Sequence, residues 1–75
     1  MEELFKVLER IKPGVDFRNN TSLIDDEILD SFDIVTLVAA LDEEFDVQIT
    51  AKDILPENFN SAEAMYKLIE KLEEE

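Results

Sequence analysis

The chain has 75 residues, of which 20 are acidic and seven basic, and it contains neither cysteine nor histidine. This length allows one small domain over residues 1–75, and an apolar fraction of 45% supplies a core. The net charge of −13 repels phosphates, so it argues against nucleic acid and favours basic protein surfaces as partners. Without thiols or imidazoles there is no disulfide, thiolate nucleophile or imidazole base, and we expect no metal site.

The sequence gives no sign of secretion or of membrane insertion. Its first ten residues, MEELFKVLER, are charged throughout, unlike a signal peptide. No apolar run is long enough to cross a membrane. We expect a cytoplasmic, monomeric protein.

A short amphipathic helix is predicted for residues 1–11, and Pro13-Gly14 ends it. Its apolar face contains Leu4, Leu8 and Ile11, flanked by Phe5 and Val7. A long connection over residues 12–30 follows, with too many apolar side chains for a free linker. We expect this connection to pack across the helices through Val15, Phe17, Leu23, Ile24, Ile28 and Leu29.

The strongest helix signal covers residues 31–45. An apolar stripe at helical spacing predicts its buried face: Ile34, Leu37, Val38, Leu41 and Phe45. Further along, Thr50-Ala51-Lys52-Asp53 resembles a capping box and would open a short helix that Pro56 closes.

Asn60 or Ser61 is expected to cap a last helix. The predicted buried face of that helix contains Ala62, Met65, Leu68, Ile69 and Leu72. The fold class is therefore all-α: a small antiparallel bundle of three main helices plus one short helix, with a long first loop.

A second apolar strip on the 31–45 helix is not explained by the core stripe. Phe32, Val35 and Ala39 lie on a neighbouring face, and Asp42, Glu43 and Glu44 follow one turn later. An apolar strip that is followed by acidic residues suits a docking surface for a basic partner. The long first loop would equally well cover this strip and make it core, and spacing alone does not decide between the two.

Ser31 begins the same helix within the stretch ILDSFDIV. Its hydroxyl would serve as an N-cap, a role that Asp30 fills equally well with Asp33 three residues further on. No base lies near it, so Ser31 is not a self-activated catalytic serine. It would still accept a modification from another enzyme, and a helix N-terminus favours a phosphodiester there, although the neighbouring carboxylates oppose it.

The sequence resembles the acyl carrier protein family over nearly its whole length. Asp30-Ser31-Phe32 matches the motif that opens the family's second helix, and LVAALDEEFDVQI and ENFNSAEAMYKLI match in order and spacing. The resemblance implies an acyl-carrier-like fold and a protein that is not itself an enzyme. It also implies that Ser31 carries 4'-phosphopantetheine, which a separate, magnesium-dependent phosphopantetheinyl transferase transfers from coenzyme A. It also implies that Asp30 assists recognition by that transferase, and it assigns partner binding to Phe32, Asp33, Val35, Ala39, Asp42 and Glu43.

Three departures separate the chain from the usual fatty-acid carriers. Phe32 replaces leucine, Glu27-Ile28-Leu29 replaces glycine and alanine, and Thr36 replaces glutamate. In these features the chain is more similar to D-alanyl, peptidyl and other specialised carriers. The cargo that the resemblance implies is therefore fatty acyl, D-alanyl, aminoacyl or polyketide.

Two functions of different class follow from these observations. The first is a carrier that presents a thioester to acyl- or aminoacyl-loading and acyl-transferring enzymes, whose basic patches contact its acids. The alternative is an unmodified, acidic helical interaction module with the carrier fold. A third hypothesis, weak binding of a divalent cation, rests on the acids around the motif: Asp25, Asp26, Glu27, Asp30 and Asp33.

Overall fold

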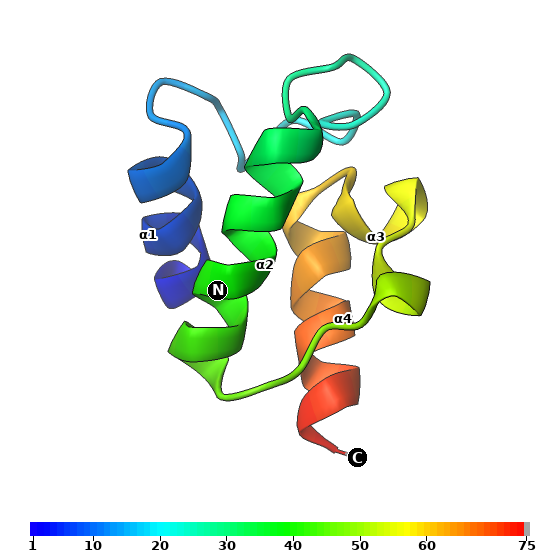
Figure 1. Ribbon diagram of the computed structural model, residues 1–75. Coiled ribbons are helices and arrows are strands. Elements are labelled where there is room, and N and C mark those ends of the chain that lie inside the picture. The colour runs from blue at the N-terminus through cyan, green and yellow to red at the C-terminus, as the bar shows by residue number, and fades with distance from the viewer. Residues whose placement is uncertain (75) are drawn as a thin grey trace.

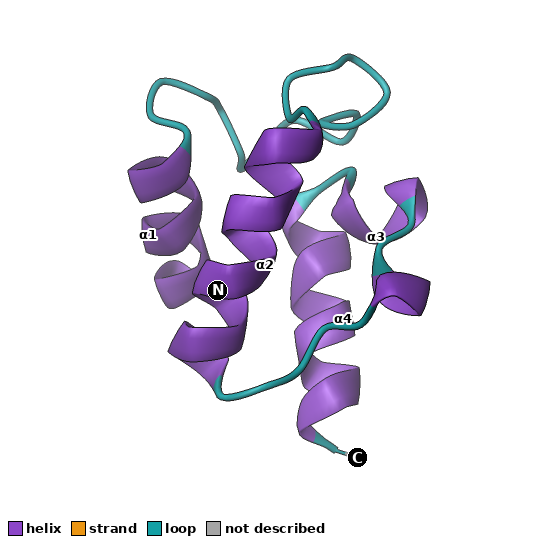
Figure 2. Ribbon diagram, viewed as in Figure 1, coloured by secondary structure: helices purple, strands orange, loops and turns teal. Residues whose placement is uncertain are grey.

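The computed structural model describes residues 1–74, which form four α-helices and one short 3-10 turn (Figure 1). They are α1 (Glu2–Ile11), α2 (Ser31–Phe45), the 3-10 turn η1 (Ala51–Asp53), α3 (Pro56–Phe59) and α4 (Ala62–Glu73). Figure 2 shows that loops connect these helices, with no strand among the described residues. The predicted all-α class, the three main helices and the long first loop are confirmed.

The direction of the helices differs in part from the prediction. α1 runs opposite to α2, whereas α2 and α4 run in the same direction (Figure 1). The reason is the segment between them, residues 46–61, which holds η1 and α3 and returns along the molecule before α4 begins. The antiparallel arrangement therefore holds for α1 against α2 and α4.

One core joins all four helices and the first loop. The buried apolar side chains are Leu4, Val7, Leu8, Phe17, Leu23, Leu29, Ile34, Leu37, Leu41, Ile49, Phe59, Ala62, Met65, Leu68 and Ile69. Val7 is buried where the sequence placed it at the flank, and Ile11 is only half-buried because it lies at the end of α1. Val38, Phe45 and Leu72 are half-buried at the edge of the core.

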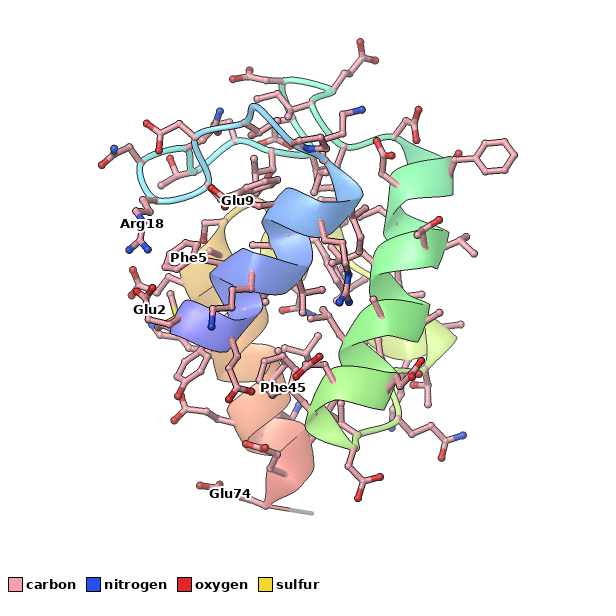
Figure 3. The ribbon with its side chains drawn as sticks, turned by 90° about the vertical axis from the view of Figure 1, so that its left-hand side faces the viewer. Glu2, Phe5, Glu9, Arg18, Phe45 and Glu74 are labelled. Atoms are coloured by element: carbon pink, nitrogen blue, oxygen red, sulfur yellow. The ribbon has the colours of Figure 1, made fainter. Side chains whose placement is uncertain are left out.

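The first loop is part of this core, as the sequence predicted. Phe17, Leu23 and Leu29 are buried, while the other three apolar residues of the loop are half-buried. Arg18 fastens the loop to α1: its guanidinium lies 4.1 Å from the centre of the Phe5 ring and 3.1 Å from a carboxylate oxygen of Glu2 (Figure 3). Buried apolar side chains and this contact together order the loop.

The short helix differs from its prediction. Thr50 and Asp53 form the expected capping box, but the element that it opens is only the turn η1. Pro56 begins α3 instead of closing a helix. Proline suits the first position of a helix, because the N–H that it lacks would have no partner there.

Candidate functional site

Asp30 caps the N-terminus of α2, and Ser31 is the first helical residue. The Asp30 carboxylate accepts a 2.8 Å hydrogen bond from the main-chain N–H of Asp33. In return, the Asp33 carboxylate accepts a 3.1 Å bond from the main-chain N–H of Asp30. Of the two candidate caps, the structure selects Asp30, and the interpretation of Ser31 as the cap is wrong. Ser31 is exposed and takes no part in the capping box.

Lys12 binds the other side of this cap. Its ammonium lies 3.0 Å from Asp33 Oδ2, the oxygen that also accepts the Asp30 N–H. The N–H of Asp30 holds the pKa of the Asp33 carboxyl below its ordinary value of 3.8, and the Lys12 ammonium lowers that pKa further, against an opposing effect of burial. The carboxylates next to Ser31 are thus bound by donors and partly neutralised, which weakens their repulsion of an anion on Ser31.

The second strip of α2 faces solvent. Phe32 and Val35 are 83% and 68% exposed, and Ala39 is exposed as well. The opposite face of α2 is buried through Ile34, Leu37 and Leu41. The first loop therefore does not cover the strip, and the interpretation of these three residues as core is wrong. A large aromatic ring and a branched aliphatic group in the open are typical of a contact surface.

The acids after the strip differ in what they contact. Asp42 is half-buried, and its carboxylate accepts a 2.9 Å hydrogen bond from the Ile49 N–H, which fixes the turn after α2. Glu43 and Glu44 are exposed. Glu43 follows Phe32 and Ala39 at helical spacing, so the strip and one exposed acid lie on the same side of α2.

An apolar pocket beside α2 was not predicted from the sequence. It has a volume of about 130 Å³. Its lining comes from the first loop, α2 and the region of α3: Ile24, Ile34, Ile54, Leu55, Pro56 and Phe59. Ile54 and Leu55 are 40% and 43% exposed. The sequence signal for the pocket is the apolar pair Ile54-Leu55 directly before Pro56, in the segment where the sequence predicts the end of a short helix.

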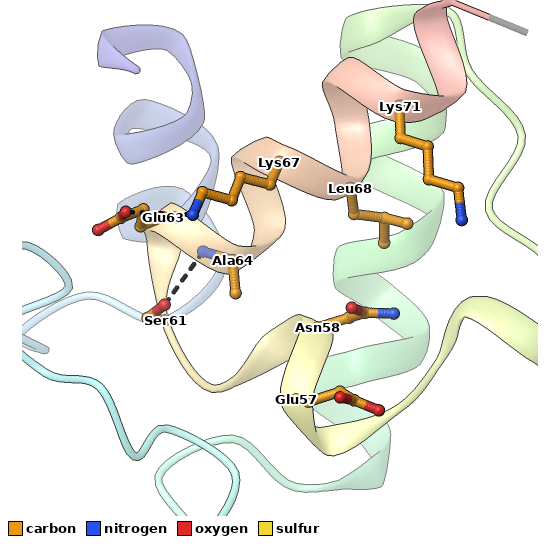
Figure 4. Close-up of a pocket in the computed structure, with 8 residues that line it drawn as sticks. All are labelled: Glu57, Asn58, Ser61, Glu63, Ala64, Lys67, Leu68 and Lys71. Atoms are coloured by element: carbon orange, nitrogen blue, oxygen red, sulfur yellow. Dashed lines mark hydrogen bonds and ion pairs between the residues drawn. The ribbon is translucent and has the colours of Figure 1, made fainter.

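A larger depression of about 470 Å³ lies on α3 and α4 (Figure 4). Its lining is mainly polar and includes Glu57, Lys67 and Lys71, with no residue of α2. The Ser61 hydroxyl at its edge accepts a 3.0 Å bond from the Ala64 N–H and so caps α4, which settles the choice between Asn60 and Ser61. This depression is separate from the start of α2.

Two further observations concern ions and membranes. Within residues 1–74, no group of three or more acidic, histidine or cysteine side chains is arranged to hold a metal ion. The acids named for a divalent cation in the sequence do not form such a group.

In the same part of the chain, no helix combines the length and the apolar character needed to cross a membrane.

Comparison with known proteins gives one family and two relatives. The family model described as phosphopantetheine attachment site matches residues 2–74. An acyl carrier protein of Buchnera aphidicola subsp. Schizaphis graminum is 51% identical over 35 residues, which are 47% of this chain and 44% of the relative. An acyl carrier protein of Buchnera aphidicola subsp. Baizongia pistaciae is 38% identical over 53 residues, which are 71% of this chain and 65% of the relative.

The chain thus spans less than two thirds of the length of either relative. No solved structure shows a significant match to it.

The cap geometry predicts a difference in stability between two adjacent substitutions. Asp30→Ala removes the acceptor for the Asp33 N–H and should lower the free energy of unfolding by about 0.5–2 kcal/mol. Ser31→Ala removes an exposed hydroxyl outside the cap and should change it by less than about 0.5 kcal/mol. Urea denaturation followed by circular dichroism measures both. A larger loss in Ser31→Ala than in Asp30→Ala would contradict the assignment of the cap.

The lowered pKa of Asp33 predicts a pH-dependent contribution to stability. The folded state binds the Asp33 proton less tightly than the unfolded state does. The stabilisation is therefore complete above the ordinary value of 3.8 and is lost as the pH falls through the lowered pKa. Asp33→Asn should reduce the free energy of unfolding at about pH 7, and the gap to the parent should narrow at about pH 3. The exposed Asp26→Asn controls for the change in net charge. A gap for Asp33→Asn that is constant with pH would contradict the lowered pKa of Asp33.

Proposed function

We propose a carrier function for this chain, which belongs to the acyl carrier protein family of proteins with a phosphopantetheine attachment site. In our proposal, Ser31 holds a 4'-phosphopantetheine arm, and acyl or aminoacyl cargo is attached to that arm as a thioester. Residues 1–75 would form a single carrier domain, which the family match over residues 2–74 supports. The observation that supports the site most is the exposed Ser31 at the first position of α2, next to a cap that does not need its hydroxyl.

The local chemistry is compatible with a phosphodiester on Ser31. The positive end of the α2 dipole stabilises an anion at this position. Asp30 and Asp33 are occupied by main-chain N–H groups, and Lys12 supplies a positive charge beside them. Asp30 would in addition contribute to recognition by the transferase.

A separate enzyme is needed to attach the arm. In our proposal a phosphopantetheinyl transferase directs the Ser31 oxygen to the pyrophosphate of coenzyme A. A phosphodiester forms, and the adenosine bisphosphate portion leaves. The bound arm supplies a terminal thiol, which a chain without cysteine lacks. The protein itself would be a carrier and not an enzyme.

Partner enzymes would contact the exposed strip of α2. Phe32, Val35 and Ala39 supply apolar contact, and Glu43 supplies an exposed acid on the same side. Asp33 and Asp42 were assigned to the same surface by resemblance, but the Asp33 carboxylate accepts the Asp30 N–H at the start of α2, and the Asp42 carboxylate accepts the Ile49 N–H after its end. We therefore propose that Glu43 contributes most to the attraction of basic partners, while Asp33 and Asp42 shape the helix that presents it.

The exposed strip also favours one alternative, an unmodified interaction module that binds proteins through Phe32 and Val35 alone. The carrier and the unmodified interaction module differ in whether Ser31 is modified, and this difference is directly measurable.

The cytoplasmic location and the monomeric state stay predictions of the sequence.

Transfer of the arm tests the proposal. Incubation with coenzyme A, magnesium and a broad-specificity phosphopantetheinyl transferase should add the mass of one phosphopantetheine to the parent chain and none to Ser31→Ala. Because Ser31 lies outside the cap, the variant should keep its helical circular dichroism spectrum. Intact mass spectrometry gives the result. An unmodified parent with an intact fold would favour the interaction module, and modification of Ser31→Ala would overturn the site.

Electrostatic steering by Glu43 gives a second test. Glu43→Gln should slow the association of the transferase more than it changes dissociation, and added salt should reduce the difference. Glu70→Gln, an exposed acid on α4, makes the same change in net charge and is the matched control. Stopped-flow or surface plasmon resonance kinetics measure both rates. Equal association rates for the two variants would show that position on α2 does not matter.

A further inference from the structure

Asn60, between α3 and α4, is bound to the first loop by four hydrogen bonds. Its carbonyl oxygen accepts the Leu23 N–H at 2.9 Å. Its side-chain Oδ1 accepts the N–H groups of Ile24 and Asp25 at 3.0 and 3.1 Å. Its Nδ2 donates to Asp25 Oδ2 at 3.2 Å. One residue therefore joins the loop before Ser31 to the end of α3.

These bonds connect two walls of the apolar pocket beside α2. Ile24, on the loop wall, donates directly to Asn60, and Phe59, on the α3 wall, precedes Asn60 in the chain. Leu23 is completely buried, so parting the walls would leave its N–H without the Asn60 carbonyl as partner. A buried donor that loses its partner is costly, and the Asn60 bonds therefore resist widening of the pocket.

The pocket is within reach of a group attached to Ser31. Ile34 lines it and lies three residues after Ser31 on α2, and residues at this spacing are neighbours on one side of a helix. The pocket volume of about 130 Å³ is close to that of a cavity of about 150 Å³ that binds benzene. A short apolar group of about this size fills the pocket, and a longer one extends into solvent.

We propose that Asn60 is a specificity-determining residue that limits the length of apolar cargo this chain shields. The inference rests on the carrier function proposed above. By holding the loop wall against the α3 wall, Asn60 keeps the pocket at the size of a short acyl group. Cargo beyond that size gains no further burial unless the side-chain bonds of Asn60 to Ile24 and Asp25 break.

The test compares acyl groups of increasing length on Ser31. Butanoyl-, hexanoyl- and decanoyl-coenzyme A are used as transferase substrates, and the Tm of each product is measured. In the parent, Tm should rise from butanoyl to hexanoyl and then level off, because burial of each further CH₂ group is what stabilises the fold. Asn60→Ala removes the three side-chain bonds to Ile24 and Asp25 and keeps the main-chain bond to Leu23. In this variant, Tm should rise more from hexanoyl to decanoyl than in the parent, because only one of the four bonds then holds the two walls together.

Asn58→Ala is the matched control. The Asn58 side chain makes a hydrogen bond within its own segment, from Nδ2 to the Asp53 carbonyl at 2.9 Å, and this bond does not reach the first loop. It should keep the levelling-off of the parent. If Asn60→Ala does not fold, Asp25→Ala removes only the bond from Asn60 Nδ2 at an exposed position and should still give a larger rise from hexanoyl to decanoyl than the parent.

Two results would overturn the inference: a parent whose Tm still rises at decanoyl, or Asn60 and Asp25 variants that level off as the parent does. A parent that accepts no arm would instead overturn the carrier function. The Asn60 bonds are then tested in the unmodified protein by amide hydrogen exchange at Ile24 and Asp25. Exchange should be about fivefold faster in Asn60→Ala than in Asn58→Ala, the factor for one hydrogen bond of about 1 kcal/mol. Equal rates would overturn the role of Asn60 as well.

Discussion

The Asp30 carboxylate accepts the N–H of Asp33, and the Asp33 carboxylate accepts that of Asp30 in return. This reciprocal capping box fixes where α2 begins, and Lys12 ties the end of α1 to the same point. The main consequence concerns the neighbouring serine. Because Asp30 satisfies the helix N-terminus, Ser31 lies at the first helical position with an exposed hydroxyl that the fold does not use. Asp30 thus has the structural role of the cap, and the hydroxyl of the adjacent Ser31 stays accessible.

The start of α2 also depends on an ordered first loop. That loop is long, yet it buries Phe17, Leu23 and Leu29 in the common core. Polar contacts to three different helical regions add to this: Arg18 with α1, Lys12 with α2, and Asn60 from the α3–α4 junction. These three contacts fix the loop relative to the helices, and the loop in turn positions Ser31 and one wall of the apolar pocket. The segment before Ser31 is therefore fixed by a few buried side chains and polar contacts, although a domain of this size can bury only a small core.

Much of this was predictable because it depends on local patterns. The sequence predicted α2 correctly from two local features, because apolar spacing and capping act within a few residues. These features are the acidic residues at its start and the apolar stripe of Ile34, Leu37 and Leu41. The apolar residues of the first loop correctly indicated packing. The motif around Ser31 indicated the family, which comparison with known proteins supports.

The remaining features depend on contacts between distant segments. Spacing alone could not show that Phe32 and Val35 stay exposed, because this depends on where the first loop lies. The direction of α4 depends on the path of residues 46–61, and the role of Pro56 depends on where η1 ends. Asn60 was noted only as a possible cap, since its partners Leu23 to Asp25 lie more than thirty residues away in the chain. Pairings at that separation leave no periodic signal in one sequence.

In the proposed function, Ser31 holds the phosphopantetheine arm in the living cell. The most direct test of this assignment is peptide mass mapping of the chain purified from its native host, without added transferase. We expect the peptide containing Ser31 to have the mass of one phosphopantetheine added, and fragmentation to place this mass on the serine. The assignment of Ser31 would be contradicted if that peptide were found only unmodified in an expressed chain. It would also be contradicted if the added mass mapped to another residue.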